Sequence, residues 1–192
     1  RVQRMKQMIN SASDKEFKQD KIKILAELTR LRQLCCNPSL IYEDYVNGSG
    51  KEDMCIDLIR RAVEGGHKIL LFSQFTSMLD LLCKRLEKEH ISFYLLVGST
   101  PKAKRAQLVE QFQQDSVPVF CISLKAGGTG LNLTAADIVI HYDPWWNMSA
   151  QNQATDRAHR LGQEKTVQVF KLFVKNTIEE KIERLQQRKR DL

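Results

Sequence analysis

The chain has 192 residues, of which 42% are hydrophobic, with 9 glycines and 4 prolines, so it is long enough to bury the core of a globular domain. Lysine and arginine total 30 against 23 acidic residues, and the formal charge of +7 favours a polyanionic partner, with solvating surface charge as the alternative. No apolar run approaches the roughly 20 residues that span a bilayer, and residues 1–20 are too polar for a signal peptide, so we expect no membrane partner.

The five cysteines indicate the redox environment. They are odd in number and lack C-x-x-C spacing, which predicts neither a zinc site nor a disulfide framework: Cys35, Cys36, Cys55, Cys83 and Cys121. A reducing, intracellular location is therefore expected. The sequence has no initial methionine, and it begins and ends inside charged helical patterns. We therefore expect a fragment of a longer protein.

The first quarter of the chain predicts helix and loop. Residues 1–20 are polar with weak periodicity, which is typical of a helix end followed by a loop. The next residues carry an apolar stripe at i, i+4, i+7 and i+11, which predicts an amphipathic helix that must dock on another element: Ile24, Leu28, Leu31 and Cys35. Asn37 and Pro38 should end that helix. Residues 42–53 have the composition of a surface loop.

Strand and helix patterns then alternate to the end of the chain. Five short apolar runs predict strands, the first two of them buried: 68–73, 93–97, 117–123, 138–143 and 166–174. Helices are predicted at about 54–64, 79–90, 101–113, after residue 147, and from 176 onward. This alternation predicts a parallel α/β sheet whose ligand-binding loops share the edge at the carboxyl ends of the strands. The terminal helix is expected to pack against the helix around Leu28.

Two loops after predicted strands are rich in small residues. KAGGTG (125–130) can form a concavity of backbone N–H groups around an anion, with an ordinary tight turn as the alternative. GST (98–100), before Pro101, can receive a phosphate in the same way, with a helix cap as the alternative. The sequence contains neither a Walker A motif, G-x-x-x-x-G-K-[ST], nor an acidic box that would hold Mg²⁺.

Three polar residues recur at helical spacing near the end of the sheet pattern. Gln153, Arg157 and Arg160 stand at i, i+4 and i+7, which predicts one helix face carrying two guanidinium groups. Arginine binds phosphate oxygens in a bidentate manner, so the pair suits a multiply charged anion. The anion can be a nucleotide, a nucleic-acid backbone or neighbouring carboxylates. Arginines supplied across an interface accelerate phosphoryl transfer by about 10³–10⁵.

The remaining motif residues give weaker predictions. Of Trp145 and Trp146, one indole is expected in the core and the other at the surface, within reach of a sugar or a base. His159 has no serine or carboxylate partner in a recognisable constellation, so we interpret it as structural. The sequence shows no catalytic triad, no paired carboxylates and no set of metal ligands, and we predict no metal site in this chain.

Six runs resemble the Swi/Snf-type DNA translocases of helicase superfamily two, specifically their second RecA-like lobe. They are ILLFSQF (69–75), GST with Arg105 downstream, SLKAGGTGLNLTAADIVIHYDPWWN (123–147), QATDRAHRLGQ (153–163), LRQLCCNPSL (31–40) and TIEEKIERLQQRKRDL (177–192). The resemblance covers residues 21–192, and DRAHRLGQ after DPWWN is its most specific part. It implies a RecA-like parallel sheet flanked by helices, with a helical segment (1–50), the lobe (51–175) and a brace helix (176–192).

The resemblance also implies roles for individual residues. Arg157 and Arg160 would be arginine fingers of an ATP site in the cleft between two lobes, supported by Gln153. Residues implied near the nucleotide are Gly128, Gly130 and Leu131. Residues implied to couple that site to DNA are Lys125, Ala126, Gly127 and Thr129. Those implied along the DNA phosphate track are Ser73, Gln74, Gly98, Ser99, Thr100, Arg105 and Trp146. The implied cofactor is ATP with Mg²⁺, the metal being held mainly by a first lobe that this sequence lacks.

The function implied is that of the second motor lobe of an ATP-dependent double-stranded DNA translocase or remodeller. Its implied partners are double-stranded DNA and the N-terminal lobe of the same parent protein, and a protein bound to DNA is a further candidate. The chain alone should not hydrolyse ATP. Two alternatives are a non-catalytic nucleic-acid-binding module and a strand-separating helicase, the latter disfavoured by the tryptophan pair and by DRAHRLGQ. The sequence departs from the family's usual pattern at Val97, where an acidic residue is common, and at Cys36-Asn37-Pro38, which replaces C-N-H-P.

Overall fold

The computed structural model describes residues 14–126 and 131–190. Its elements in chain order are α2 (Asp14–Cys36), η1 (Pro38–Leu40), α3 (Gly50–Glu64), β1 (Ile69–Ser73), α4 (Thr76–Lys88), β2 (Phe93–Leu96), α5 (Lys102–Gln114), β3 (Val119–Ser123), β4 (Ile138–His141), α6 (Met148–Asp156), β5 (Gln168–Lys171) and α7 (Ile178–Arg190). All five predicted strands are present, each shorter than its apolar run. None of the helices in this described part is long and apolar enough to cross a membrane.

The strands form one parallel sheet in the order β2-β3-β1-β4-β5, which confirms the predicted architecture. In the central strand, Leu71 pairs with Cys121 of β3 on one side and with Ile140 of β4 on the other. The strands β1, β3 and β4 are buried along their whole length. The prediction that 93–97 is a buried strand is wrong, because β2 lies at an edge of the sheet and is only half-buried.

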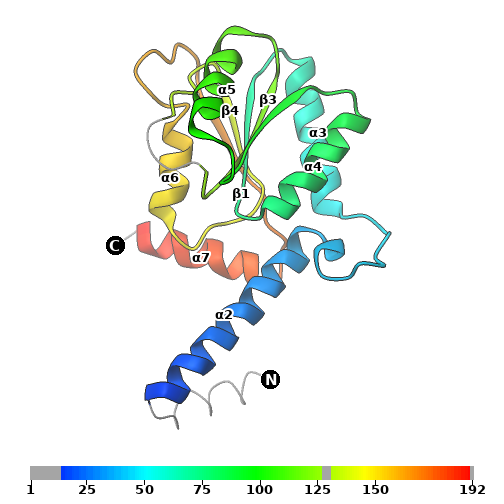
Figure 1. The fold of residues 1–192 in the computed structure, drawn as a ribbon, viewed down its shortest axis with the longest axis vertical. Coiled ribbons are helices and arrows are strands. Elements are labelled where there is room, and N and C mark those ends of the chain that lie inside the picture. The colour runs from blue at the N-terminus through cyan, green and yellow to red at the C-terminus, as the bar shows by residue number, and fades with distance from the viewer. Residues whose placement is uncertain (1–13, 127–130, 191–192) are drawn as a thin grey trace.

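Alternate residues of the central strands face two separate cores. Ile69 and Leu71 of β1 pack with α3 and α4, whereas Leu70 and Phe72 pack with residues of α5 and α6. The ribbon shows the same layering, with α3 and α4 on one face and α5 and α6 on the other (Figure 1). A continuous apolar run therefore becomes a strand covered on both faces, as expected for parallel sheets.

The helix α2 is longer than predicted and docks only by its last turns. It begins at Asp14, so the predicted loop before residue 21 is wrong for the described residues. The helix ends at Cys36 immediately before Asn37, as predicted. Its amino-terminal half projects away from the lobe (Figure 1). Leu31, predicted in the docking stripe, is 47% exposed, whereas Arg32 and Cys36 are buried. The docked part of α2 contacts α7, as predicted for the terminal helix.

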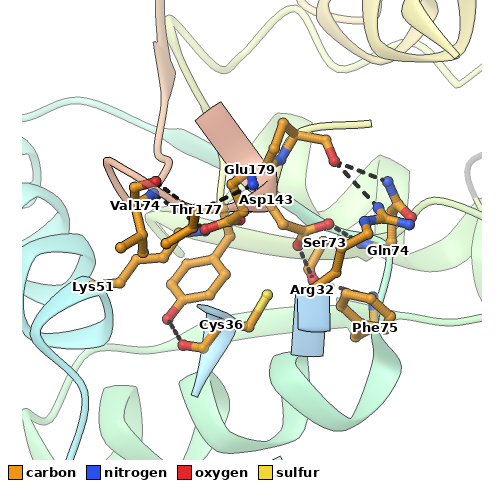
Figure 2. A network of polar contacts seen from close by, with 12 residues as sticks. Arg32, Cys36, Lys51, Ser73, Gln74, Phe75, Asp143, Val174, Thr177 and Glu179 are labelled. Atoms are coloured by element: carbon orange, nitrogen blue, oxygen red, sulfur yellow. Dashed lines mark hydrogen bonds and ion pairs between the residues drawn. The ribbon is translucent and has the colours of Figure 1, made fainter. Parts of the chain in front are cut away.

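A buried ion pair joins the helices that flank the sheet. Lys51 at the start of α3 donates to both carboxylate oxygens of Glu179 in α7, at 2.9 and 2.6 Å, and lies 4.8 Å from the ring centroid of Tyr142 (Figure 2). The Tyr142 hydroxyl donates to the carbonyl of Cys36 at the end of α2, at 2.7 Å. These contacts connect α2, α3, α7 and the end of β4. The proposed division of the chain at residues 50 and 175 stays a prediction.

Candidate functional site

Four loops meet at the carboxyl edge of the sheet. They follow β2 (97–101), β3 (124–126), β1 (74–75) and β4 (142–147), and these four strands are consecutive in the sheet. The sequence-predicted site residues of the four loops therefore share one edge, as expected for parallel strands. Gly127, Gly128, Thr129 and Gly130, which were also predicted here, lie outside the described residues.

The loop after β1 is fixed to the loop after β4 by Asp143. The Ser73 hydroxyl donates to Asp143 Oδ1 at 2.5 Å, and the Gln74 backbone N–H donates to Asp143 Oδ2 at 3.2 Å. The Ser73 oxygen also accepts from the Phe75 N–H at 3.1 Å (Figure 2). Burial raises the pKa of the Asp143 carboxyl. Ser73 itself is fully buried, so its side chain does not lie on the surface where a DNA contact was predicted.

The GST loop is held by the side chain of Arg105 from α5. Its Nε donates to Thr100 O and its Nη2 to Gly98 O, both at 2.8 Å, while its Nη1 donates to Ala126 O at 3.0 Å. The guanidinium therefore joins the loop after β2 to the loop after β3. The sequence predicted Arg105 as a phosphate contact, but most of its N–H groups are directed at backbone carbonyls.

Only some groups of the GST loop and of the loop after β3 are exposed to solvent. Gly98 and Ser99 are exposed, and the Thr100 hydroxyl accepts from the Val97 N–H at 3.1 Å. Lys125 is exposed, whereas the Ala126 side chain is buried. Among the described residues of these two loops, the Gly98 and Ser99 backbone and the Lys125 ammonium are therefore the groups available to an anion.

The arginine pair does not lie on one helix face, and that prediction is wrong. The helix α6 ends at Asp156, Arg157 caps it, and Arg160 lies in the following turns. The Arg157 carbonyl accepts from the Leu133 N–H at 3.1 Å, so a contact distant in sequence takes the carbonyl that a continuing helix would use. Arg160 and Gln153 are exposed, and Arg157 is only 6% exposed.

Arg157 has an unusual environment. Among the described residues, its Nε and Nη1 have no hydrogen-bond partner. Burial lowers the pKa of Arg157, and the nearby charge of Arg160 lowers it further. A cavity of about 80 Å³ lies beside it, lined by Phe72, Leu124, Trp145, Ala150, Gln153 and Ala154. Buried guanidinium N–H groups are costly to leave unpaired, so this position suits an incoming anion. A second cavity, of about 360 Å³, is lined by Asn132, Arg160 and Leu161.

One of the two adjacent tryptophans is buried and the other is exposed, as predicted. Trp145 is fully buried and packs edge-on against Phe72 and His141, whereas Trp146 is 43% exposed. Burial lowers the pKa of His141 to about 3, and the imidazole, which is within 3.0 Å of the Thr155 hydroxyl, is therefore neutral near pH 7. The Asn147 side chain caps α6 by accepting from the Ser149 N–H at 3.0 Å.

Three residues of this site were not identified from the sequence. Asp143 ties two loops together, and Arg32 of α2 donates to the Pro144 carbonyl at 3.2 Å. Gln163 donates through Nε2 to the carbonyls of Thr134 and Ala136, at 2.9 and 2.8 Å, and so fixes the segment after α6. Each lies inside a run that carries the family resemblance, but its partners are distant in sequence. In the described part of the chain, no group of His, Cys, Asp and Glu side chains could hold a metal ion.

Comparisons with known proteins cover most of the chain. Residues 50–162 match the family described as the Helicase conserved C-terminal domain. The "Uncharacterized ATP-dependent helicase" of Mycoplasma pneumoniae is 41% identical over 170 residues, which are 88% of this chain and 16% of the relative. Human "SWI/SNF-related matrix-associated actin-dependent regulator of chromatin subfamily A member 1" is 39% identical over 178 residues, which are 86% of this chain and 17% of the relative.

Solved structures show the same arrangement of elements. The "Sulfolobus solfataricus SWI2/SNF2 ATPase core in complex with dsDNA" superimposes with a TM-score of 0.79 at 36% identity, covering 99% of this chain and 40% of that one. The chain spans about a sixth of the length of the two curated relatives above.

Proposed function

The chain belongs to the helicase conserved C-terminal domain family, among the SWI2/SNF2-type ATPases, and from this we propose that it is the second motor lobe of an ATP-dependent double-stranded DNA translocase. The parent protein would carry the first lobe, which supplies the Walker A loop that this sequence lacks. The proposal draws on relatives named as ATP-dependent helicases and on a similar structure solved with double-stranded DNA. Intracellular DNA is the proposed substrate, and a protein bound to it remains a proposed further partner.

The observation that carries this proposal is the buried Arg157 guanidinium. Within the described ranges, two of its nitrogens lack a partner, and it borders a cavity at the carboxyl edge of the sheet. A buried structural arginine would be expected to meet a carboxylate or a set of carbonyls, and even the half-buried Arg105 meets several carbonyls. Unpaired donors in a partly closed cavity fit a phosphate group delivered from outside the chain.

ATP with Mg²⁺ would supply the free energy of phosphoanhydride hydrolysis. The donor set within residues 14–126 and 131–190 fits its phosphates but not its metal. In the proposed mechanism, Arg157 and Arg160 present positive charge where negative charge develops on the γ-phosphate. Gln153, which lines the cavity beside Arg157, is proposed to support the two arginines. Leu131, Gly128 and Gly130 are proposed to lie near the ribose or the base.

The remaining edge of the sheet is proposed to hold the phosphate track of DNA. Gly98, Ser99 and Thr100 would receive one backbone phosphate, and Lys125 and Trp146 lie on the same edge. Gln74, whose amide donates to the Pro144 carbonyl at 3.2 Å, is proposed to contact the duplex between them, because β1 lies between β3 and β4 in the sheet. Gly127 and Thr129 are proposed to connect this track to the nucleotide. Lobe closure would move the track relative to the first lobe and so advance the duplex.

The proposal is tested in a protein that joins this chain to the missing lobe. Its ATPase rate should rise when double-stranded DNA is added, and Arg160→Ala should lower the DNA-stimulated rate by about 10³-fold or more. Duplex affinity should change little, because Arg160 is not on the proposed phosphate track. Arg61→Ala, which removes an exposed arginine of α3, is the matched control and should keep the wild-type rate.

Two results would overturn parts of this proposal. Undiminished ATPase activity in Arg160→Ala would remove the arginine-finger role. Salt-sensitive duplex binding without any ATPase activity in the joined protein would favour a non-catalytic nucleic-acid-binding module instead.

A further inference from the structure

Arg32 connects a helix outside the matched domain to the DNA-facing loop. It comes from α2, before the matched residues 50–162, and it is only 6% exposed. Figure 2 shows its side chain entering the polar network that contains Ser73, Gln74 and Asp143. An arginine this deeply buried at the end of a docking helix requires specific partners.

The partners of Arg32 belong to two different loops of the carboxyl edge. Its Nη2 donates to the Pro144 carbonyl at 3.2 Å, the same oxygen that accepts from Gln74. Its guanidinium carbon lies 5.5 Å from the ring centroid of Phe75 and 5.6 Å from that of Trp146. Both distances are within the range of a cation–π interaction. The planar guanidinium thus contacts two aromatic rings and one carbonyl at once.

Trp146 needs such a contact to keep one orientation. Its indole is 43% exposed, so packing in the core does not fix it as packing fixes the fully buried Trp145. A lysine ammonium is a point charge and does not stack as a plane, so it cannot reproduce the same set of contacts. Burial lowers the pKa of Arg32, and the nearby Asp143 carboxyl opposes that effect.

We propose that Arg32 is a positioning residue that orients the Trp146 indole for DNA, so that the DNA contact of this loop depends on the docking of α2. The inference rests on the proposed function, because it assigns Trp146 to the DNA side of the lobe. The inference also places part of the DNA-binding machinery outside residues 50–162, which match the helicase C-terminal domain.

The orientation of Trp146 is measured first, without DNA. The chain has two tryptophans, so acrylamide quenching of its fluorescence reports one exposed and one buried indole. Arg32→Gln and Arg32→Lys should both raise the quenching constant of the exposed indole and shift its emission to longer wavelength. In a Trp146→Phe background the same substitutions should change nothing. Arg30→Gln, an exposed arginine on the same helix, is the matched control. If Arg32→Gln unfolds the chain, Arg32→Lys provides the measurement.

Duplex binding is measured next, by titrating a labelled double-stranded oligonucleotide. Arg32→Gln should weaken binding by about threefold to tenfold, as for loss of one oriented aromatic contact, and Arg32→Lys by a similar factor. The double variant Arg32→Gln/Trp146→Ala should bind no more weakly than Trp146→Ala alone, because both substitutions remove the same contact.

The outcomes separate this inference from the proposed function. Unchanged quenching in both Arg32 variants, or losses of affinity that add in the double variant, would overturn the positioning role. Changed quenching combined with unchanged duplex affinity for Trp146→Ala would support positioning of the indole, and it would refute the assignment of Trp146 to DNA.

Discussion

Replacing Arg157 by methionine should increase the stability of the lobe and abolish its function. Arg157 is 6% exposed, and in the part of the chain that the structure describes its Nε and Nη1 atoms have no hydrogen-bond partner. Each unsatisfied buried donor costs about 1–3 kcal/mol. Methionine keeps much of the length of the side chain and removes both donors together with the buried charge. We therefore expect the free energy of unfolding to rise by about 1–3 kcal/mol, after some loss of packing.

Two assays check this expectation. Urea denaturation of the 192-residue chain measures the free energy of unfolding, and the thermal midpoint should rise by about 2–4 °C for each kcal/mol gained. In the protein joined to the first lobe, the same substitution should remove DNA-stimulated ATPase activity. The control is Arg61→Met, which replaces an arginine whose side chain is 77% exposed and should leave both quantities near their wild-type values.

A decrease in the free energy of unfolding of Arg157→Met would refute the reasoning. It would mean that the guanidinium is satisfied within the lobe, so that Arg157 would be a structural residue. An increase in stability with full ATPase activity would instead separate Arg157 from the reaction and leave the unsatisfied donors without a functional explanation.

Three further predictions follow from other contacts of the lobe. Arg105→Lys should weaken duplex binding as much as Arg105→Gln, because one ammonium cannot hold the carbonyls of both loops, and wild-type affinity in the lysine variant would indicate a direct phosphate contact. Because burial lowers the pKa of His141 to about 3, between that pH and about 6.5 the unfolded chain takes up a proton that the folded chain does not. The free energy of unfolding therefore falls as the pH falls. Between about pH 7 and pH 5, denaturation should show that the wild type loses about 2 kcal/mol more of this free energy than His141→Gln. Equal losses would contradict the lowered pKa of His141. Lys51→Met should lower the free energy of unfolding by about 3–5 kcal/mol by leaving Glu179 unpaired, and Lys51→Met/Glu179→Leu should recover most of that loss.

The sheet could be predicted from the sequence because each strand is an apolar run between helical patterns. Right-handed crossovers restrict the handedness of each connection, but the order of the strands, and therefore which strands lie at the edges, does not follow from the runs themselves. FYLLV at 93–97 looks as buried as ILLFS at 69–73, yet β2 has a neighbour on one side only. Local hydrophobicity indicates that a strand is covered by helices and says nothing about its neighbours in the sheet.

The sequence identified the residues of the arginine site but not their arrangement in space. The spacing of Gln153, Arg157 and Arg160 is helical, but α6 stops at Asp156 where the Leu133 N–H takes the Arg157 carbonyl. A tertiary hydrogen bond thus overrides the local pattern. The result separates the two arginines: one is buried beside a cavity, and the other is exposed on the following turns.

Arg105 and Arg32 show the same limit for side-chain roles. The family resemblance implied a phosphate contact for Arg105, but the guanidinium is directed at carbonyls up to 21 residues away. The partner of Arg32 lies 112 residues away. Only the fold brings these groups together, so the sequence can indicate that an arginine is important without indicating what it contacts.

The most direct test of the account is movement along double-stranded DNA. A third strand bound to a duplex as a triplex is displaced by a protein that travels along the duplex, and a forked duplex is separated only by a strand-separating helicase. For the protein that joins this chain to its first lobe, we predict ATP-dependent displacement of the third strand and no separation of the fork, with Arg157→Ala and Arg160→Ala inactive. Separation of the fork, or DNA-stimulated ATP hydrolysis without displacement of the third strand, would contradict the proposal that this chain is half of a double-stranded DNA translocase.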